Sequence, residues 1–130
     1  MQPVAVMTFK DNRAYVKITN AALGDMTEVV YVWTTPEGEW LRVGTSRAPL
    51  KKRLQNYASH ISRALEGKNS PTPLSEAQDW RKLIKKHKQL IALAHQPPYT
   101  NTIAGKVRPY LDIERVLISE KRPPLNRSHR

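Results

Sequence analysis

Two charged side chains lie where an amphipathic helix would place them at or near its buried face. Arg53 follows Leu50 by three positions and precedes Tyr57 by four, so helical geometry puts it at the edge of an apolar stripe. A guanidinium is planar, permanently charged and carries a fork of donors that matches phosphate oxygens. In a phosphodiesterase, Arg53 would stabilise the charge that develops on the transferring phosphorus.

Glu114 is the second of these side chains. It lies three residues after Leu111 and four before Ile118, which places it on or beside the buried face of a helix. An isolated buried carboxylate is very costly, so this glutamate must either pair with a cation or bind a metal ion. Periodicity alone leaves both interpretations open, including an ion pair between Glu114 and Arg53.

A β-hairpin and a helix would position Arg53. Residues 29–34 are rich in β-branched and aromatic types, residues 35–38 form a turn with proline at its second position, and residues 39–44 are strand-like again. Five residues then recur at helical spacing: Leu50, Leu54, Tyr57, Ile61 and Leu65. We therefore expect a hairpin, a short loop and a helix that ends near Gly67.

Together these segments resemble the GIY-YIG nuclease family. Val29-Val30-Tyr31 is similar to the first, Gly-Ile-Tyr-like strand of that family, Arg42-Val43-Gly44 to its Tyr-Ile-Gly-like strand, and residues 50–54 to its arginine helix. Residues 114–126 are similar to the closing block of the family, which has a metal-binding glutamate, an apolar helix, proline and asparagine. The resemblance implies an α+β fold in one domain, residues 1–130, with a small antiparallel sheet and about three helices.

The resemblance also implies hydrolysis of phosphodiester bonds in DNA, leaving a 5′-phosphate and a 3′-hydroxyl. Glu114 would hold one Mg²⁺ or Mn²⁺ ion, and magnesium commonly uses few carboxylates and keeps its waters. Arg53 would stabilise charge, and Tyr31 would orient or deprotonate the attacking water. Tyr57 matches a family position held by histidine or tyrosine, and Asn126 would brace the site. The structural alternatives are packing of both tyrosines and a helix-terminating role for the asparagine.

Arg42 departs from the family pattern, because it stands where the second strand of the family has tyrosine. An arginine remains protonated and cannot serve as an ordinary general base. It could instead hold the scissile or a neighbouring phosphate. Equally, the change could mark a catalytically inactive nucleic-acid-binding module on the same scaffold, so both functions are carried forward.

Composition favours a polyanionic partner. The 130 residues include 22 Lys and Arg against 11 Asp and Glu, a formal net charge of +11. Such an excess favours nucleic acid, because each neutralised phosphate releases counterions. We expect DNA, with RNA as an alternative that includes an accessory RNA-binding protein of ribosomal type. The sequence shows neither a basic helix with a large exposed apolar face nor a long apolar run, so it does not indicate membrane binding. We expect a cytoplasmic protein, with a secreted toxin left open.

The remaining segments flank this framework. Residues 1–27 are expected to add an N-terminal hairpin, and residues 68–96 a basic inserted helix that begins after Ser75 and runs to about His95. Residues 99–107 fit either a strand or a loop. A last helix should begin near Pro109 and lead into the closing segment, residues 109–126.

Seven basic residues on these segments are candidates for contacting nucleic acid: Lys51, Lys52, Lys82, Lys85, Lys86, Lys106 and Arg108. For the lysines of the basic helix the alternative is a solvated helix face. Other chemistries fit the sequence less well. The four histidines lack zinc-ligand spacing, there is no cysteine, and five glycines form no phosphate-binding loop.

Overall fold

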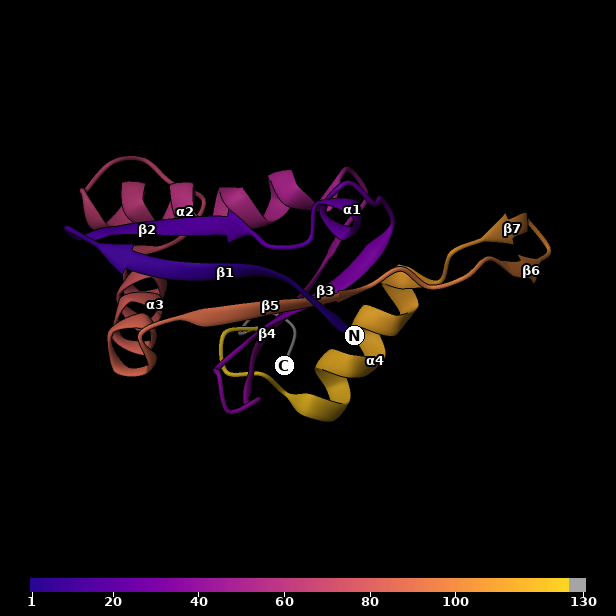
Figure 1. Cartoon of the computed structure of the whole chain (residues 1–130). Helices are drawn as coiled ribbons and strands as arrows, with labels where there is room; N and C mark the ends of the chain where they lie inside the picture. The colour runs from indigo at the N-terminus through magenta and orange to yellow at the C-terminus, as the bar shows by residue number, and fades with distance from the viewer. Residues whose placement is uncertain (127–130) are drawn as a thin grey trace.

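The computed structural model describes residues 1–126 and places a five-stranded antiparallel sheet, ordered β2-β1-β5-β3-β4, among four helices (Figure 1). The sheet strands are β1 (Gln2–Lys10), β2 (Arg13–Ile18), β3 (Val29–Thr34), β4 (Trp40–Ser46) and β5 (Leu90–His95). The helices are α1 (Ala21–Gly24), α2 (Leu50–Leu65), α3 (Leu74–His87) and α4 (Tyr110–Lys121). The predicted α+β class and the N-terminal hairpin are confirmed; the four-residue α1 was not predicted.

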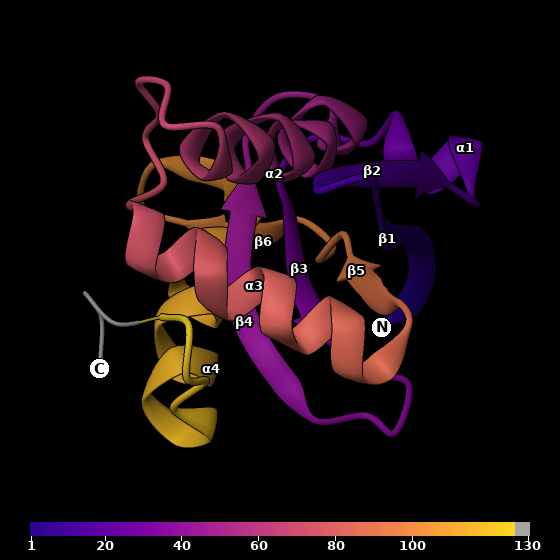
Figure 2. The same ribbon diagram turned by 90° about the vertical axis from the view of Figure 1, so that its left-hand side faces the viewer.

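Strand β3 is buried on both faces of the sheet, because all six of its residues are buried. On one face Tyr31 and Trp33 belong to a core with α2 and α3, and on the other Val30 and Val32 belong to a core with α4. Figure 2 shows α2 and α3 together, with α4 on a different side of the sheet. Burying a polar atom without a hydrogen-bond partner is costly, so the hydroxyl of Tyr31 on this buried strand needs such a partner.

A bulge in the β3–β4 hairpin sets which side chains of β4 face α2. Trp33 pairs with Arg42, but Thr34 pairs with Trp40, so Leu41 is the extra residue. Arg42 and Gly44, opposite Trp33 and Tyr31, therefore project from the same face of the sheet as these aromatic residues. The side chain of Tyr31 lies across Gly44, where an added Cβ would overlap the tyrosine hydroxyl.

Helix α2 agrees with the sequence-based expectation at both ends. It spans Leu50–Leu65, buries Leu50, Leu54 and Ile61, and is followed by Gly67 with a φ of +76°. Its Ser62 hydroxyl accepts a hydrogen bond from the backbone N–H of Ala14 at 2.9 Å. This contact ties α2 to β2 and fixes the helix over the sheet.

The prediction that one inserted helix runs from just after Ser75 to about His95 is wrong. Helix α3 begins at Leu74, directly after Pro73 and without side-chain capping by Ser75, and ends at His87. Lys88 has a φ of +73°, and Leu90–His95 then form β5, the middle strand between β1 and β3. The backbone of β5 pairs with β1 on one side and with β3 on the other, and alternate residues of β5 are buried. These tertiary interactions outweigh the helical spacing of the segment.

Residues 99–107, left open by the sequence, contain a separate two-stranded hairpin. Strands β6 (Thr100–Thr102) and β7 (Gly105–Val107) pair with each other and extend away from the body of the molecule (Figure 1). Helix α4 follows with Pro109 as its N-cap residue, close to the predicted start. Within the described residues, none of the helices is long and apolar enough to cross a membrane.

Replacing Gly44 by alanine should destabilise the fold, because the new methyl group and the buried Tyr31 side chain need the same space. We expect the free energy of unfolding in urea to fall by about 1–3 kcal/mol, the usual cost of overpacking. In a Tyr31→Ala background the methyl group has room, so Gly44→Ala should cost much less there. Equal losses in the two backgrounds would show that the ring does not impose the glycine.

Candidate active site

A cleft of about 660 Å³ opens at the β4 edge of the sheet, between α2, the start of α3, α4 and the C-terminal segment. Its lining includes all six residues that the sequence singled out for catalysis: Tyr31, Arg42, Arg53, Tyr57, Glu114 and Asn126. They come from two strands, two helices and the segment after α4, so the fold has brought together residues up to 95 positions apart.

Tyr31 and Tyr57 form the floor of the cleft. Their hydroxyl groups share a hydrogen bond of 2.7 Å, and their rings meet edge to face. Tyr57 also packs edge-on against Trp33 and Trp80, which hold its ring in place. Tyr31 is only 1% exposed, and burial, followed by Tyr57, raises the pKa of Tyr31 well above its ordinary value. Tyr31 therefore stays protonated at neutral pH.

Arg42 forms one wall of the cleft and has three partners. Its Nε donates to the Tyr57 hydroxyl at 3.2 Å, its Nη1 donates to the Leu125 carbonyl at 2.9 Å, and the same nitrogen lies 3.5 Å from a Glu76 carboxylate oxygen. Burial lowers the pKa of Arg42, but Tyr57 and Glu76 outweigh burial, and the net pKa is raised. A fixed positive charge thus lies at the position where the GIY-YIG nuclease family has a tyrosine.

Asn126 attaches the end of the described chain to β4. It is 1% exposed, its Oδ1 accepts from the Val43 backbone N–H at 2.7 Å, and its Nδ2 donates to the Val43 carbonyl at 2.8 Å. The backbone N–H of Leu125 also donates to β4, to the Leu41 carbonyl at 2.9 Å. These contacts place the Leu125 carbonyl against Arg42, so Asn126 braces one side of the cleft.

Arg53 and Glu114 lie at the more exposed part of the cleft. Arg53 is exposed, as expected for the edge of the α2 stripe, and its Nε donates to the Thr45 carbonyl at 3.3 Å. Glu114 is half-buried on α4 and reaches the cleft from the other face of the sheet. The nearby Asp112 is exposed and lies 3.4 Å from Arg115, its neighbour on the same helix.

The cleft offers two carboxylates, Glu114 and Glu76, to a cation. Within residues 1–126 there is no group of three or more His, Cys, Asp or Glu side chains that could hold a metal ion. Such a donor set suits an ion that retains water and binds substrate oxygens, as Mg²⁺ does, and does not suit a closed structural site. Glu76 lies 3.5 Å from an Arg42 nitrogen at the start of α3, and Glu114 reaches the cleft from α4.

The polar cleft residues that sequence reasoning missed include Asn56, His60 and Glu76. Asn56 and His60 lie three and seven positions after Arg53, so the helical period that identified Tyr57 could have found both. Glu76 carried no such signal. Its approach to Arg42 depends on how α3 packs beside α2, which the local sequence does not encode.

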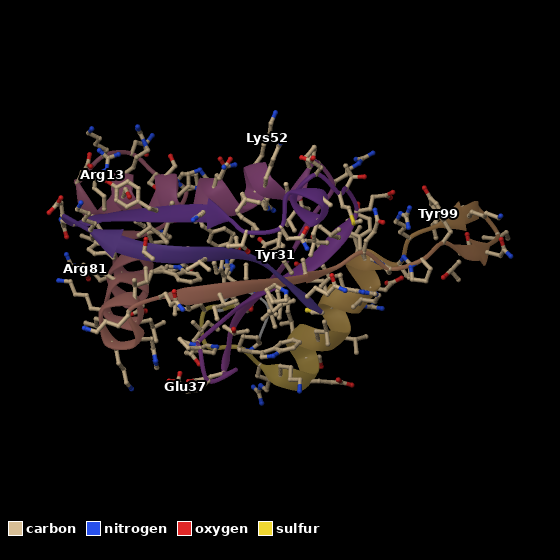
Figure 3. The ribbon with its side chains drawn as sticks, in the orientation of Figure 1. Arg13, Tyr31, Glu37, Lys52, Arg81 and Tyr99 are labelled. Atoms are coloured by element: carbon tan, nitrogen blue, oxygen red, sulfur yellow. The ribbon has the colours of Figure 1, made fainter. Side chains whose placement is uncertain are left out.

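The seven predicted nucleic-acid contacts do not form one surface. Lys52 lines a smaller cleft beside Arg53, but Lys51 lies 2.9 Å from Asp25. The lysines of α3 occupy the end of that helix opposite Glu76, and Lys85 lies over the Phe9 ring of β1. In Figure 3 Tyr31 lies inside the molecule, whereas Lys52 and Arg81 project from its periphery. Lys106 and Arg108 belong to the β6–β7 hairpin and its base.

Asn126→Ala should destabilise the protein, because the buried N–H and carbonyl of Val43 would both lose their partner. We expect the free energy of unfolding to fall by about 1–3 kcal/mol in urea titrations. Gln55→Ala, on the exposed face of α2, is the control and should change it by less than about 0.5 kcal/mol. Equal effects of the two substitutions would refute a bracing role for Asn126.

The raised pKa of Tyr31 predicts a loss of stability at alkaline pH. The unfolded chain ionises this tyrosine near pH 10 but the folded chain only above that, so its contribution is complete below about pH 10 and is lost as pH rises toward the folded value. The slope from this group should reach about 1.4 kcal/mol per pH unit. Tyr31→Phe should remove that slope in denaturation measured at several pH values, whereas Tyr15→Phe, at an exposed position on β2, should retain it.

Comparison with known proteins adds a structural finding to this geometry. No protein-family model matches the chain, and no curated protein sequence is significantly similar to it. The structure is similar to that of a mutant of EndoII of bacteriophage T4, with a TM-score of 0.63 and 15% identity over 95% of this chain and 89% of that one. It is also similar to restriction endonuclease HPY188I in complex with product DNA, with a TM-score of 0.50 and 15% identity over 92% of this chain and 72% of that one. The chain has a GIY-YIG nuclease-like fold.

Proposed function

We propose that the protein is a divalent-metal-dependent endonuclease that hydrolyses phosphodiester bonds of DNA and leaves a 5′-phosphate and a 3′-hydroxyl. One observation supports this above all: a single cleft contains two arginines, two hydrogen-bonded tyrosines and a half-buried carboxylate. These are the groups needed to hold a phosphodiester, orient a water molecule and bind one cation. The likeness to EndoII and to a DNA-bound restriction endonuclease supports the same proposal.

The two arginines hold the phosphate in this mechanism. Arg53 is exposed at the cleft and donates to the Thr45 carbonyl through its Nε, and a guanidinium carries five N–H donors, so Arg53 can also donate to a phosphate oxygen as charge develops. Arg42 is fixed by Tyr57 and Leu125 and presents its charge at a defined place. It binds the scissile or the adjacent phosphate, and its raised pKa keeps it from acting as a base.

Tyr31 and Tyr57 orient the attacking water. Because Tyr31 stays protonated at neutral pH, it acts as a hydrogen-bond donor and not as a base. One hydroxyl of the pair donates to the other, and Tyr57 also accepts from Arg42, so the directions of these hydrogen bonds are coupled. Tyr57 is half-buried and is the better placed of the two to contact a water molecule in the cleft.

Glu114 is the residue that would hold Mg²⁺ or Mn²⁺. A bound divalent ion would supply positive charge at a phosphate oxygen and would help lower the pKa of a coordinated water. Asn126 holds the segment at Leu125 against β4 and so would keep the wall that carries Arg42 in place. DNA is the proposed substrate, with RNA as the alternative polyanion of similar chemistry.

The second candidate is a catalytically inactive nucleic-acid-binding module. The observation that favours it is the set of contacts around Arg42, which is paired with Glu76 and bonded to Leu125 and therefore stabilises the cleft without substrate. Such a module would still bind DNA through the arginines of the cleft. It would not require a cation at Glu114.

The test is incubation of supercoiled plasmid with the protein in magnesium, in manganese and in excess chelator. We expect nicked and linear products with either metal and none with chelator. Glu114→Ala should lower the rate by at least about 100-fold, because the cation would lose its carboxylate ligand.

Glu120→Ala is the matched control, since it removes an exposed glutamate from the same helix, α4, and should cleave at the wild-type rate. Intact plasmid under every condition, together with salt-sensitive binding of the same DNA, would replace the endonuclease proposal with the binding module.

A further inference from the structure

The β6–β7 hairpin and its base, residues 99–108, form a projection that we call the finger. It extends from the body of the molecule ahead of α4 (Figure 1), and every residue of its two strands is exposed. Ile103 at its tip is fully exposed. The finger therefore adds little to the two cores, and its side chains are free to contact another molecule.

Both ends of the finger are held in a defined conformation. At the base, the Arg108 guanidinium stacks on the Tyr99 ring at 3.9 Å, donates to the Pro97 carbonyl at 2.9 Å and lies 3.8 Å from Glu28. At the tip, the Thr102 hydroxyl donates to the Gly105 carbonyl and accepts from the Ala104 N–H. A two-stranded hairpin is only marginally stable alone, so these contacts determine whether the finger keeps its shape.

The strand register separates the finger into two faces. Asn101 pairs with Lys106, so their side chains share one face, and Tyr99 and Arg108 continue that face toward the base. Thr100 and Val107 pair on the opposite face. One face thus carries an amide and two cations, and residues 96–111 contain no acidic residue.

This chemistry fits the major groove of duplex DNA. The groove is about 12 Å wide and admits a two-stranded β-ribbon. There an asparagine amide can make two hydrogen bonds to adenine, and a lysine can bind the acceptor edge of guanine. The stacked Arg108 near the base is placed for a phosphate, and the apolar tip suits the methyl group of thymine.

The finger also lies at a useful place in the chain. Helix α4 begins two residues after Arg108, and Glu114 lies four residues into it, about 6 Å along the axis from Tyr110. A duplex with one phosphate at the cleft therefore passes near the base of the finger. Its groove would be within reach of the two strands.

We propose that the finger enters the major groove of duplex DNA beside the bond held in the cleft and reads base sequence through Asn101 and Lys106. The assumption that the cleft holds a phosphodiester bond rests on the proposed function, but DNA binding and base reading by the finger do not require cleavage. The inference therefore concerns which DNA sequences the protein selects, and not how it cuts them.

The test is a binding selection with the full chain carrying Glu114→Ala and a library of short duplexes with a random central segment. We expect an enriched sequence over a few adjacent base pairs. Asn101→Ala combined with Lys106→Ala should reduce preference for that sequence about 10-fold or more. The matched control is Thr100→Ala, on the opposite face of the same strand, which should select the wild-type sequence.

Three outcomes would overturn the inference: no enrichment with the unmodified finger, an unchanged sequence with the Asn101 and Lys106 variant, or an equal loss with Thr100→Ala. A change of oligomeric state in the double variant, measured by light scattering, would assign the finger to contacts between copies and would also overturn it. Because the selection measures binding, failure of plasmid cleavage leaves its result unaffected, and the two proposals can fail separately.

Discussion

The outer edge of β4 is the constraint on which the cleft depends. An edge strand presents backbone donors and acceptors without a neighbouring strand, and those of residues 41 and 43 would be buried if left unpaired. Asn126 satisfies Val43 through both ends of its amide, and Leu125 satisfies Leu41 through its N–H. Two residues at the end of the described chain thereby complete the sheet, and they also supply the carbonyl that positions Arg42.

The same edge explains how residues from opposite faces of the sheet meet. Tyr31 belongs to the core beneath α2, whereas α4 packs on the other face with Val30 and Val32. Glu114, Tyr31 and Gly44 all line one cleft, although α4, which carries Glu114, packs on the opposite face of the sheet from Tyr31. At this edge Gly44 leaves the space that the tyrosine ring occupies.

The sequence predicts the elements whose signals are local. The hairpin at residues 29–46, helix α2 and helix α4 follow from alternation, from 3.6-residue periodicity and from proline and glycine at their ends. Strand β5 could not be found this way, because the left-handed residue before it is Lys88 and not glycine, and its hydrogen bonds go to strands distant in sequence. The cleft residues on α2 share one helical face and were predictable. The contact of Glu76 with Arg42 depends on tertiary packing and was not.

The net charge predicts a polyanionic partner but not where on the molecule it would bind. The fold shows which basic residues lie at the cleft and which lie away from it. The lysines near the end of α3 lie far along that helix from Glu76 and the cleft, so they add to long-range attraction more than to contact. Within the cleft, Arg42 and Arg53 are the charges that could meet a phosphate at a fixed distance, because each donates a hydrogen bond to the backbone. In the proposed function, a cleft with so few oriented cations would hold one or two phosphates and would discriminate little among sequences. Sequence selectivity would therefore require a second element near the cleft, and among the described residues the finger has both the exposure and the fixed conformation for it.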